Sequence, residues 1–180
     1  MDQSESQKEF FITYLEALRD SDDRGALAAL RRGLGKRPGE TPEMFRYVVP
    51  RLPTGLRPWE EICYYTVASL FAMHPQAGGS GNMGAHLAAI RAQNEGKSSS
   101  LEQRFTVLLS THTDDLPNHL RQIVSLLKSY GVPVNWGQLL ADIRSWDFPE
   151  SATRTKNAWA RAFWGYAAVN SPADLSSAHS

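Results

Sequence analysis

Apolar residues recur three and four positions apart along nearly the whole chain, which is the spacing of one face of an α-helix. The first such stripe consists of Phe10, Phe11, Tyr14, Leu15 and Leu18, and similar stripes follow in the second half of the chain. The alternation of apolar and polar residues that marks a half-buried strand is never sustained. The sequence therefore predicts an all-α protein.

Proline, glycine and capping residues divide this pattern into separate helices. Asp22 or Asp23 can cap a helix that begins near Arg24, and Pro58 fits the first turn of a long apolar helix. Ser99 has the spacing of a capping box with the acid three residues later. The predicted helices lie near residues 10–18, 24–34, 44–49, 58–74, 86–93, from 99 onward, 116–130, 136–146 and 153–169.

The most linker-like segment of the chain is NEGKSSS, at residues 94–100. It separates two helical regions, so we predict two small helical bundles packed side by side. The first would comprise residues 1–95 and the second residues 96–170, followed by a disordered tail at 171–180.

The charges of the chain are unevenly distributed, although 19 basic and 19 acidic residues balance overall. Residues 1–23 hold seven acids and two bases, whereas residues 24–57 hold eight bases and two acids. The segment LRRGLGKRPG at residues 30–39 alone carries Arg31, Arg32, Lys36 and Arg37. A local basic block of this kind is compatible with a polyanionic partner or an acidic protein surface, although an isolated basic run is more often an ordinary solvated surface.

Catalytic, metal and cofactor patterns are weak. His112 and His119 flank two aspartates, but their spacing matches no zinc motif. GKS at residues 96–98 lacks the glycine five positions earlier that a phosphate loop requires, and the loop GGSGNMG has no following lysine. No nucleophile lies beside a base, so we expect no enzyme activity, no metal and no cofactor.

Other features indicate a folded protein of the cytoplasm. The single Cys63 excludes an internal disulfide and lies in an apolar run, so we expect a buried thiol. The first residues are too polar for a signal peptide, and no apolar stretch is long enough to span a membrane. We expect core or interdomain packing for each tryptophan, although Trp159 and Trp164 could also stack on bases beside Arg161.

Pairs of cations seven residues apart lie on one face of a helix, about 10 Å from each other. Such pairs are Arg24 with Arg31, Arg121 with Lys128, and Arg154 with Arg161. The pattern is compatible with a groove that follows a nucleic-acid backbone, and the lack of a zinc-finger or helix-turn-helix signature argues against base-specific recognition.

Six blocks occur in order along residues 10–167: ALRRGLG, FRYVVPRLP, LFAMHPQ, LEQRFTVLLST, LPNHLRQIVSLLKSYGVPVNWGQLLADIRSW and WARAFWG. This succession resembles the CasB family, the small subunit of the type I-E CRISPR surveillance complex called Cascade. The resemblance implies an all-helical fold with two small bundles and a non-catalytic role. It also implies guide RNA, the target and displaced DNA strands, other Cascade subunits and a second copy of the chain as partners.

The candidate nucleic-acid-binding residues come from both arguments. By the resemblance, Arg31 and Arg32 match a basic position after the second helix, and Arg104, Arg121, Arg154, Lys156 and Arg161 fall in blocks where relatives carry basic residues. Arg24, Lys36, Arg37 and Lys128 follow from the charge pattern alone. The neutral balance departs from the more basic members of the family. The alternative is a helical protein-interaction scaffold whose basic loop docks an acidic partner.

Overall fold

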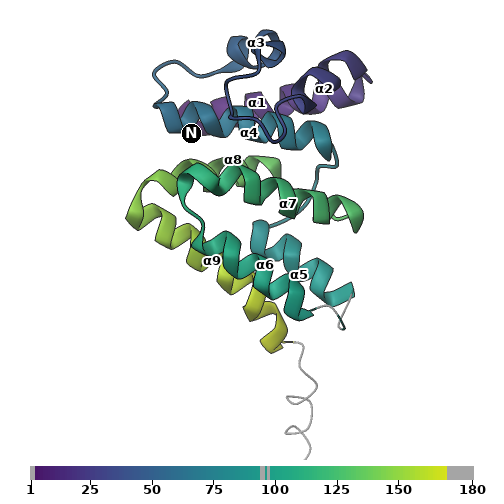
Figure 1. The fold of residues 1–180 in the computed structure, drawn as a ribbon, viewed down its shortest axis with the longest axis vertical. Coiled ribbons are helices and arrows are strands. Elements are labelled where there is room, and N and C mark those ends of the chain that lie inside the picture. The colour runs from purple at the N-terminus through teal and green to yellow at the C-terminus, as the bar shows by residue number, and fades with distance from the viewer. Residues whose placement is uncertain (1–2, 94–95, 97, 170–180) are drawn as a thin grey trace, which may run out of the picture.

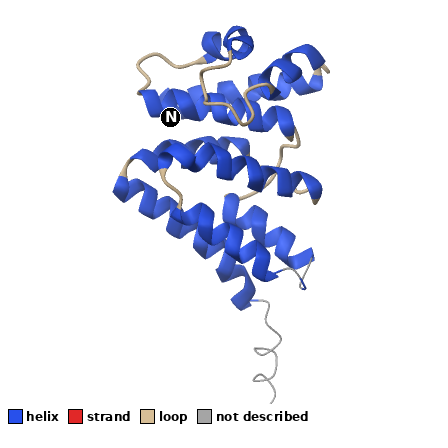
Figure 2. Cartoon of the chain, in the orientation of Figure 1, coloured by secondary structure: helices blue, strands red, loops and turns tan. Residues whose placement is uncertain are grey.

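A computed structural model of the chain describes residues 3–93, 96 and 98–169. These residues are almost entirely helical (Figure 2), and their one β-bridge, between Ala77 and Val134, is isolated. The α-helices are α1 (Gln3–Asp20), α2 (Arg24–Arg31), α3 (Pro42–Val48), α4 (Pro58–Met73), α5 (Met83–Gln93), α6 (Ser98–Ser110), α7 (Leu116–Ser129), α8 (Trp136–Arg144) and α9 (Pro149–Val169). The all-α prediction is confirmed, and no described helix is both long and apolar enough to cross a lipid bilayer.

The helices form three layers (Figure 1). At one end α1, α2 and α3 pack around α4, in the middle lie α7 and α8, and at the other end α5, α6 and α9 pack together. The middle layer contacts both others, through α4 and α1 on one side and through α5 and α6 on the other. Leu120 and Leu127 of α7 are fully buried between them.

Local chemistry sets where several helices begin. Asp23 caps α2 because its carboxylate accepts a hydrogen bond from the Ala26 amide at 2.9 Å. Pro58 occupies the first turn of α4, where the missing amide hydrogen costs nothing. Helix α6 begins at Ser98, so Ser99 lies inside the helix and not before it as expected. Helix α9 begins at Pro149, one turn earlier than predicted.

Apolar packing is continuous through the three layers. Helix α4 is buried on all sides over most of its length, and it includes Cys63, which confirms the buried thiol. The ring of Phe71 on α4 packs edge-on against Trp136 at 5.6 Å, and Trp146 packs against Trp159 on α9 at 5.1 Å. These contacts connect the elements across the layers.

Helix α5 packs chiefly on α9, although the predicted division at residue 95 assigns the two helices to different bundles. Their backbones approach closely at Gly84, where an added Cβ would collide with the Trp159 carbonyl. The division into residues 1–95 and 96–170 stays a prediction. The predicted tail at 171–180 lies outside the described residues.

Candidate nucleic-acid interface

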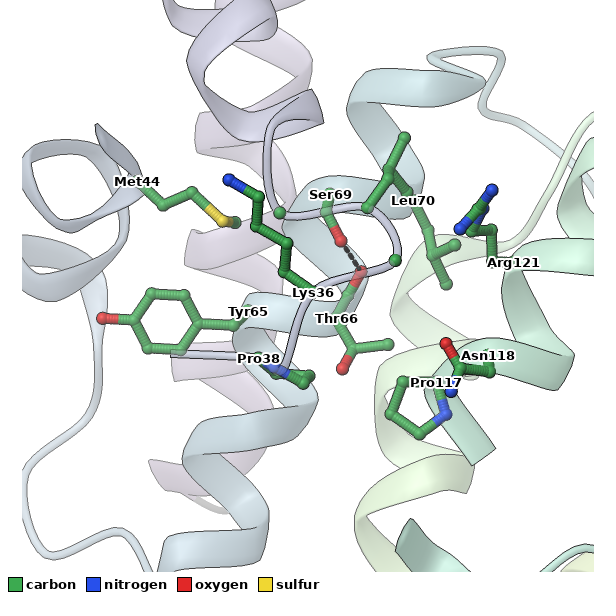
Figure 3. A pocket seen from close by; sticks show the side chains of 13 residues that line it. Lys36, Pro38, Met44, Tyr65, Thr66, Ser69, Leu70, Pro117, Asn118 and Arg121 are labelled. Atoms are coloured by element: carbon green, nitrogen blue, oxygen red, sulfur yellow. Dashed lines mark hydrogen bonds between the residues drawn. The ribbon is translucent and has the colours of Figure 1, made fainter. Parts of the chain in front are cut away.

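The basic segment after α2 forms a loop that crosses one side of α4 (Figures 1 and 3). Two glycines allow this path. Gly33 packs against the end of the Met44 side chain, which would have to shift to admit a Cβ, and Gly35 has a left-handed φ of +73°. The loop therefore presents Lys36 and Arg37 to solvent while its backbone stays close to α4.

The loop meets α7 at Arg121, whose guanidinium lies against Gly35. Figure 3 shows Lys36 and Arg121 on either side of the loop, with Thr66 and Ser69 of α4 below it. These residues line a cavity of about 20 Å³, which has room for little more than one water molecule. A polyanion would therefore contact Lys36 and Arg121 from the surface and would not enter the cavity.

Three of the predicted cations are partly neutralised by carboxylates. Arg24 pairs with Asp22 at 3.0 Å. Arg32 pairs with Glu43 at 3.3 Å, and Arg37 with Glu40 at 3.6 Å. The pKa of Glu43 is lowered, chiefly by a hydrogen bond from its own backbone and then by Arg32 and Lys36. All of these pairs are exposed, so each contributes little to stability and can open for a phosphate.

The remaining eight predicted cations make no ion pair with any carboxylate of residues 3–93, 96 and 98–169. They are Arg31, Lys36, Arg104, Arg121, Lys128, Arg154, Lys156 and Arg161. All are exposed except Lys156, which is half-buried. An unpaired, exposed cation can bind a phosphate without first losing a carboxylate, so these side chains are the stronger candidates.

Four candidates lie in the layer of α5, α6 and α9 (Figure 1), namely Arg104 on α6 and Arg154, Lys156 and Arg161 on α9. Arg121 and Lys128 are on α7, in the middle layer. The Lys156 ammonium lies 4.9 Å from the centre of the Trp146 ring, and Arg154 donates to the Ser151 hydroxyl at 3.1 Å. Arg104 and Arg161 are exposed on α6 and α9, which contact each other through aromatic rings. A continuous track from these residues to Lys36 and Arg121 stays a prediction.

The tryptophans mostly follow the prediction of core packing. Trp136, Trp146 and Trp159 are buried, and Trp59 is half-buried with its ring nitrogen donating to the Ile143 carbonyl at 2.9 Å. Trp164 differs, because 38% of it is exposed. Trp164 is five residues beyond Trp159, so it points about 140° away from it on the same helix. Its ring packs against the ring of Phe105, with 5.2 Å between the ring centres.

The residues on which the loop rests carry no signal in the sequence. Tyr65, Thr66 and Ser69 of α4 and Asn118 of α7 line the cavity beneath it. The Thr66 hydroxyl donates to the Ile62 carbonyl at 2.8 Å and the Ser69 hydroxyl to the Thr66 carbonyl at 3.0 Å. Both hydroxyls thus bond within their own helix, and no motif marks them as part of a surface.

Two of the histidines, His74 and His86, have structural contacts, and the cysteine is buried. His74 lies 2.8 Å from the Val132 carbonyl through Nε2, and His86 accepts from the Asn135 amide at 3.1 Å. Burial raises the pKa of the Cys63 thiol, which makes it a poor nucleophile. The described residues contain no group of three or more side chains that could hold a metal ion.

The helices and the loop define an all-α protein with several exposed basic side chains that make no ion pair with a described carboxylate. The family model of CRISPR-associated protein Cse2 matches residues 26–164. The chain therefore belongs to the Cse2 family, which confirms the resemblance to CasB proteins. A comparison with curated proteins returned no match.

Solved structures of related proteins have the same fold. A Cse2-family CRISPR-associated protein from Thermus thermophilus is 30% identical, with a TM-score of 0.76 over 88% of this chain and 97% of that chain. CasB from M. ruber is 29% identical, with a TM-score of 0.74 over 94% and 98%. A chain of a CRISPR RNA-guided surveillance complex, 24% identical, shares the fold with a TM-score of 0.77 over 93% and 99%.

Proposed function

We propose that the chain is a non-catalytic subunit of a CRISPR RNA-guided Cascade complex of the cytoplasm. In this role it contacts guide RNA, the target DNA strand and the displaced strand, beside other Cascade subunits and a second copy of itself. Membership of the Cse2 family supports the assignment to such a complex. The shared fold with a chain of a CRISPR RNA-guided surveillance complex adds support.

One observation carries the proposed nucleic-acid contact. Lys36 and Arg121 come from distant parts of the chain, yet they line the same cavity, and both are exposed. Neither makes an ion pair with a described carboxylate. Two free cations on one surface can hold neighbouring phosphates of a strand, and they need not recognise bases because guide pairing supplies sequence specificity.

The test is the salt dependence of binding to single-stranded and double-stranded oligonucleotides. Each phosphate that is neutralised contributes about −0.7 to −0.9 to the slope of log affinity against log salt. The double variant K36A/R121A should therefore flatten the slope by about 1.5. The variant R46A/R51A removes the same charge elsewhere and should leave the slope unchanged.

An unchanged slope for K36A/R121A would remove these two residues from the interface. Wild-type protein that shows no salt-dependent binding at all would favour the alternative of a protein-interaction scaffold. Turnover of nucleic acid that depends on a divalent cation and is lost on His112→Ala would contradict the non-catalytic role.

A further inference from the structure

A second surface combines aromatic rings and arginines where α1 meets the end of α3. The Arg51 guanidinium lies 4.5 Å from the centre of the Tyr14 ring and 5.9 Å from that of Phe10. The Arg46 guanidinium lies 5.1 Å from the Tyr47 ring. We call these residues, together with the neighbouring valine, the Arg51 surface: Phe10, Tyr14, Arg46, Tyr47, Val49 and Arg51.

The rings of this surface are connected. The pKa of Tyr14 is raised, first by burial, while Arg51 opposes the rise and Tyr47 adds to it. The geometric link is Arg51, because its guanidinium lies over both Tyr14 and Phe10 of α1. Arg46 and Tyr47 lie a few residues before Arg51 in the chain. No sequence motif marks these residues, because they come from separate segments of the chain.

Large apolar side chains are unusually exposed on the Arg51 surface. Phe10 is 59% exposed and Val49 is 51% exposed, the two highest values among the large apolar side chains of the described residues. Phe10 contacts the Arg51 guanidinium, and Val49 is two residues before Arg51 in the chain. Exposed apolar side chains beside one another, unlike scattered ones, mark a surface that a partner covers.

The arginines of this surface have no acidic partner in the described chain. The guanidinium groups of Arg46 and Arg51 make no ion pair or hydrogen bond with residues 3–93, 96 and 98–169, and the buried Nε of Arg51 has no acceptor there. Their guanidinium groups lie instead against the faces of aromatic rings. A partner that supplies a carboxylate would complement this charge.

A protein fits this surface better than a nucleic acid does. The guanidinium groups lie over the faces of Tyr14 and Tyr47, so bases cannot stack on those faces. The exposed Glu9, next to Phe10, would repel phosphates. Arginine and aromatic residues dominate the energetic centres of protein interfaces. Helix α1 also lies on the opposite side of α4 from the loop that carries Lys36 (Figures 1 and 3).

We propose that the Arg51 surface docks another protein subunit, through a carboxylate of the partner that is flanked by apolar side chains. This inference rests on the proposed function, because it requires the chain to work within a multi-subunit complex. Arg51 would bind the carboxylate, and Phe10 and Val49 would pack on the apolar side chains. The loop with Lys36 and Arg121 would then remain open to nucleic acid on the other side of α4.

The test measures how the purified chain joins a complex of the remaining Cascade subunits and guide RNA from the same genome. Val49→Ser and Arg51→Ala together should raise the half-saturating concentration at least about tenfold. The matched control is Val107→Ser, because Val107 is 46% exposed on α6, away from this surface. Its half-saturating concentration should equal that of the wild type. Arg51→Lys keeps the positive charge, so this variant should raise the half-saturating concentration less than Arg51→Ala does.

Each outcome decides the inference. Equal half-saturation for wild type and the double variant, with wild type joining the complex, overturns the docking surface and leaves the proposed function intact. Failure of the wild type to join overturns both. A double variant that instead loses oligonucleotide affinity as K36A/R121A does would make the surface a nucleic-acid platform, against the proposal. If the Arg51→Ala protein does not fold, the variants Phe10→Ser and Val49→Ser test the docking surface in its place. Both side chains are more than half exposed, so these substitutions should leave the fold intact.

Discussion

The Arg144 guanidinium donates to the Glu60 carboxylate, with 2.5 Å between Nη2 and Oε1, and so joins α8 to α4. The other carboxylate oxygen accepts from the Arg57 amide at 3.1 Å and from its guanidinium at 3.2 Å. Burial raises the pKa of Glu60, but the hydrogen bonds from Arg144 and Arg57 outweigh it and hold the pKa at about 2. This carboxylate therefore stabilises the contact between two layers.

Glu60→Gln should lower the free energy of unfolding at pH 7 by about 2–3 kcal/mol, because it removes the carboxylate that balances the half-buried charge of Arg144. The pKa of Glu60 is lower in the folded protein than in the unfolded chain. The stabilisation by its carboxylate is therefore fully present above about pH 4.5 and is lost as the pH falls towards 2. Denaturant unfolding of wild type and variant at pH 7, 4 and 2 measures the difference.

The matched control is Glu61→Gln, which removes a neighbouring, exposed carboxylate of the same helix. It should change the unfolding free energy by less than about 0.5 kcal/mol. Equal effects of the two substitutions at pH 7 would show that the contact between α4 and α8 contributes nothing specific.

His86 should make the fold sensitive to acid at a higher pH than Glu60 does. Burial lowers the pKa of His86 to about 4, and its Nε2 accepts from the Asn135 amide, so the ring is neutral in the folded protein. The unfolded chain binds a proton at about pH 6.5, so stability should fall as the pH drops from about 6.5 to 4. An NMR titration of the His86 ring should give a midpoint well below 6; a midpoint near 6.5 would contradict the burial of a neutral ring.

Some helix ends were predictable from sequence because they depend on local chemistry, and the family was predictable from the order of its sequence blocks. The Asp23 cap, Pro58 at the start of α4 and the buried Cys63 each follow from neighbouring residues. The partners of each helix were not predictable. Periodicity shows which face of α5 is apolar but not that it packs on α9, and nothing in the sequence pairs Glu60 with a residue 84 positions away.

The candidate site shows the same division. The cluster from Arg31 to Arg37 was visible as a run of charges. The partial neutralisation of this cluster by carboxylates was not visible in the sequence, because Arg32 pairs with Glu43 eleven residues away on another helix. The meeting of Lys36 with Arg121 required the path of the loop across α4. Local charge therefore predicted the residues, and tertiary packing separated the paired cations from the free ones.

Arg31 and Arg32 should differ in their contributions to nucleic-acid binding, although they are adjacent. Arg32 is paired with Glu43, whereas Arg31 has no described carboxylate partner and bonds only to the Leu27 carbonyl. Arg31→Ala should flatten the salt slope by about 0.7–0.9, and Arg32→Ala by less, because a paired cation releases fewer counterions. Fluorescence anisotropy with a labelled oligonucleotide across a salt series measures both slopes. A larger effect of Arg32→Ala would show that Glu43 does not compete with phosphate.

Gly84→Ala tests the close approach of α5 to α9. A Cβ at residue 84 would collide with the Trp159 carbonyl, and a backbone atom in a helix cannot move aside as a flexible side chain can. We expect a loss of about 2–4 kcal/mol in unfolding free energy, larger than the small gain in helix propensity. Gly25→Ala is the control, because a Cβ there would meet only the Asp23 carboxylate, at an ordinary 3.6 Å. It should be neutral or slightly stabilising by thermal unfolding. If both variants melt at the wild-type temperature, the two helices are not packed backbone to backbone, and the layer of α5, α6 and α9 is looser than described.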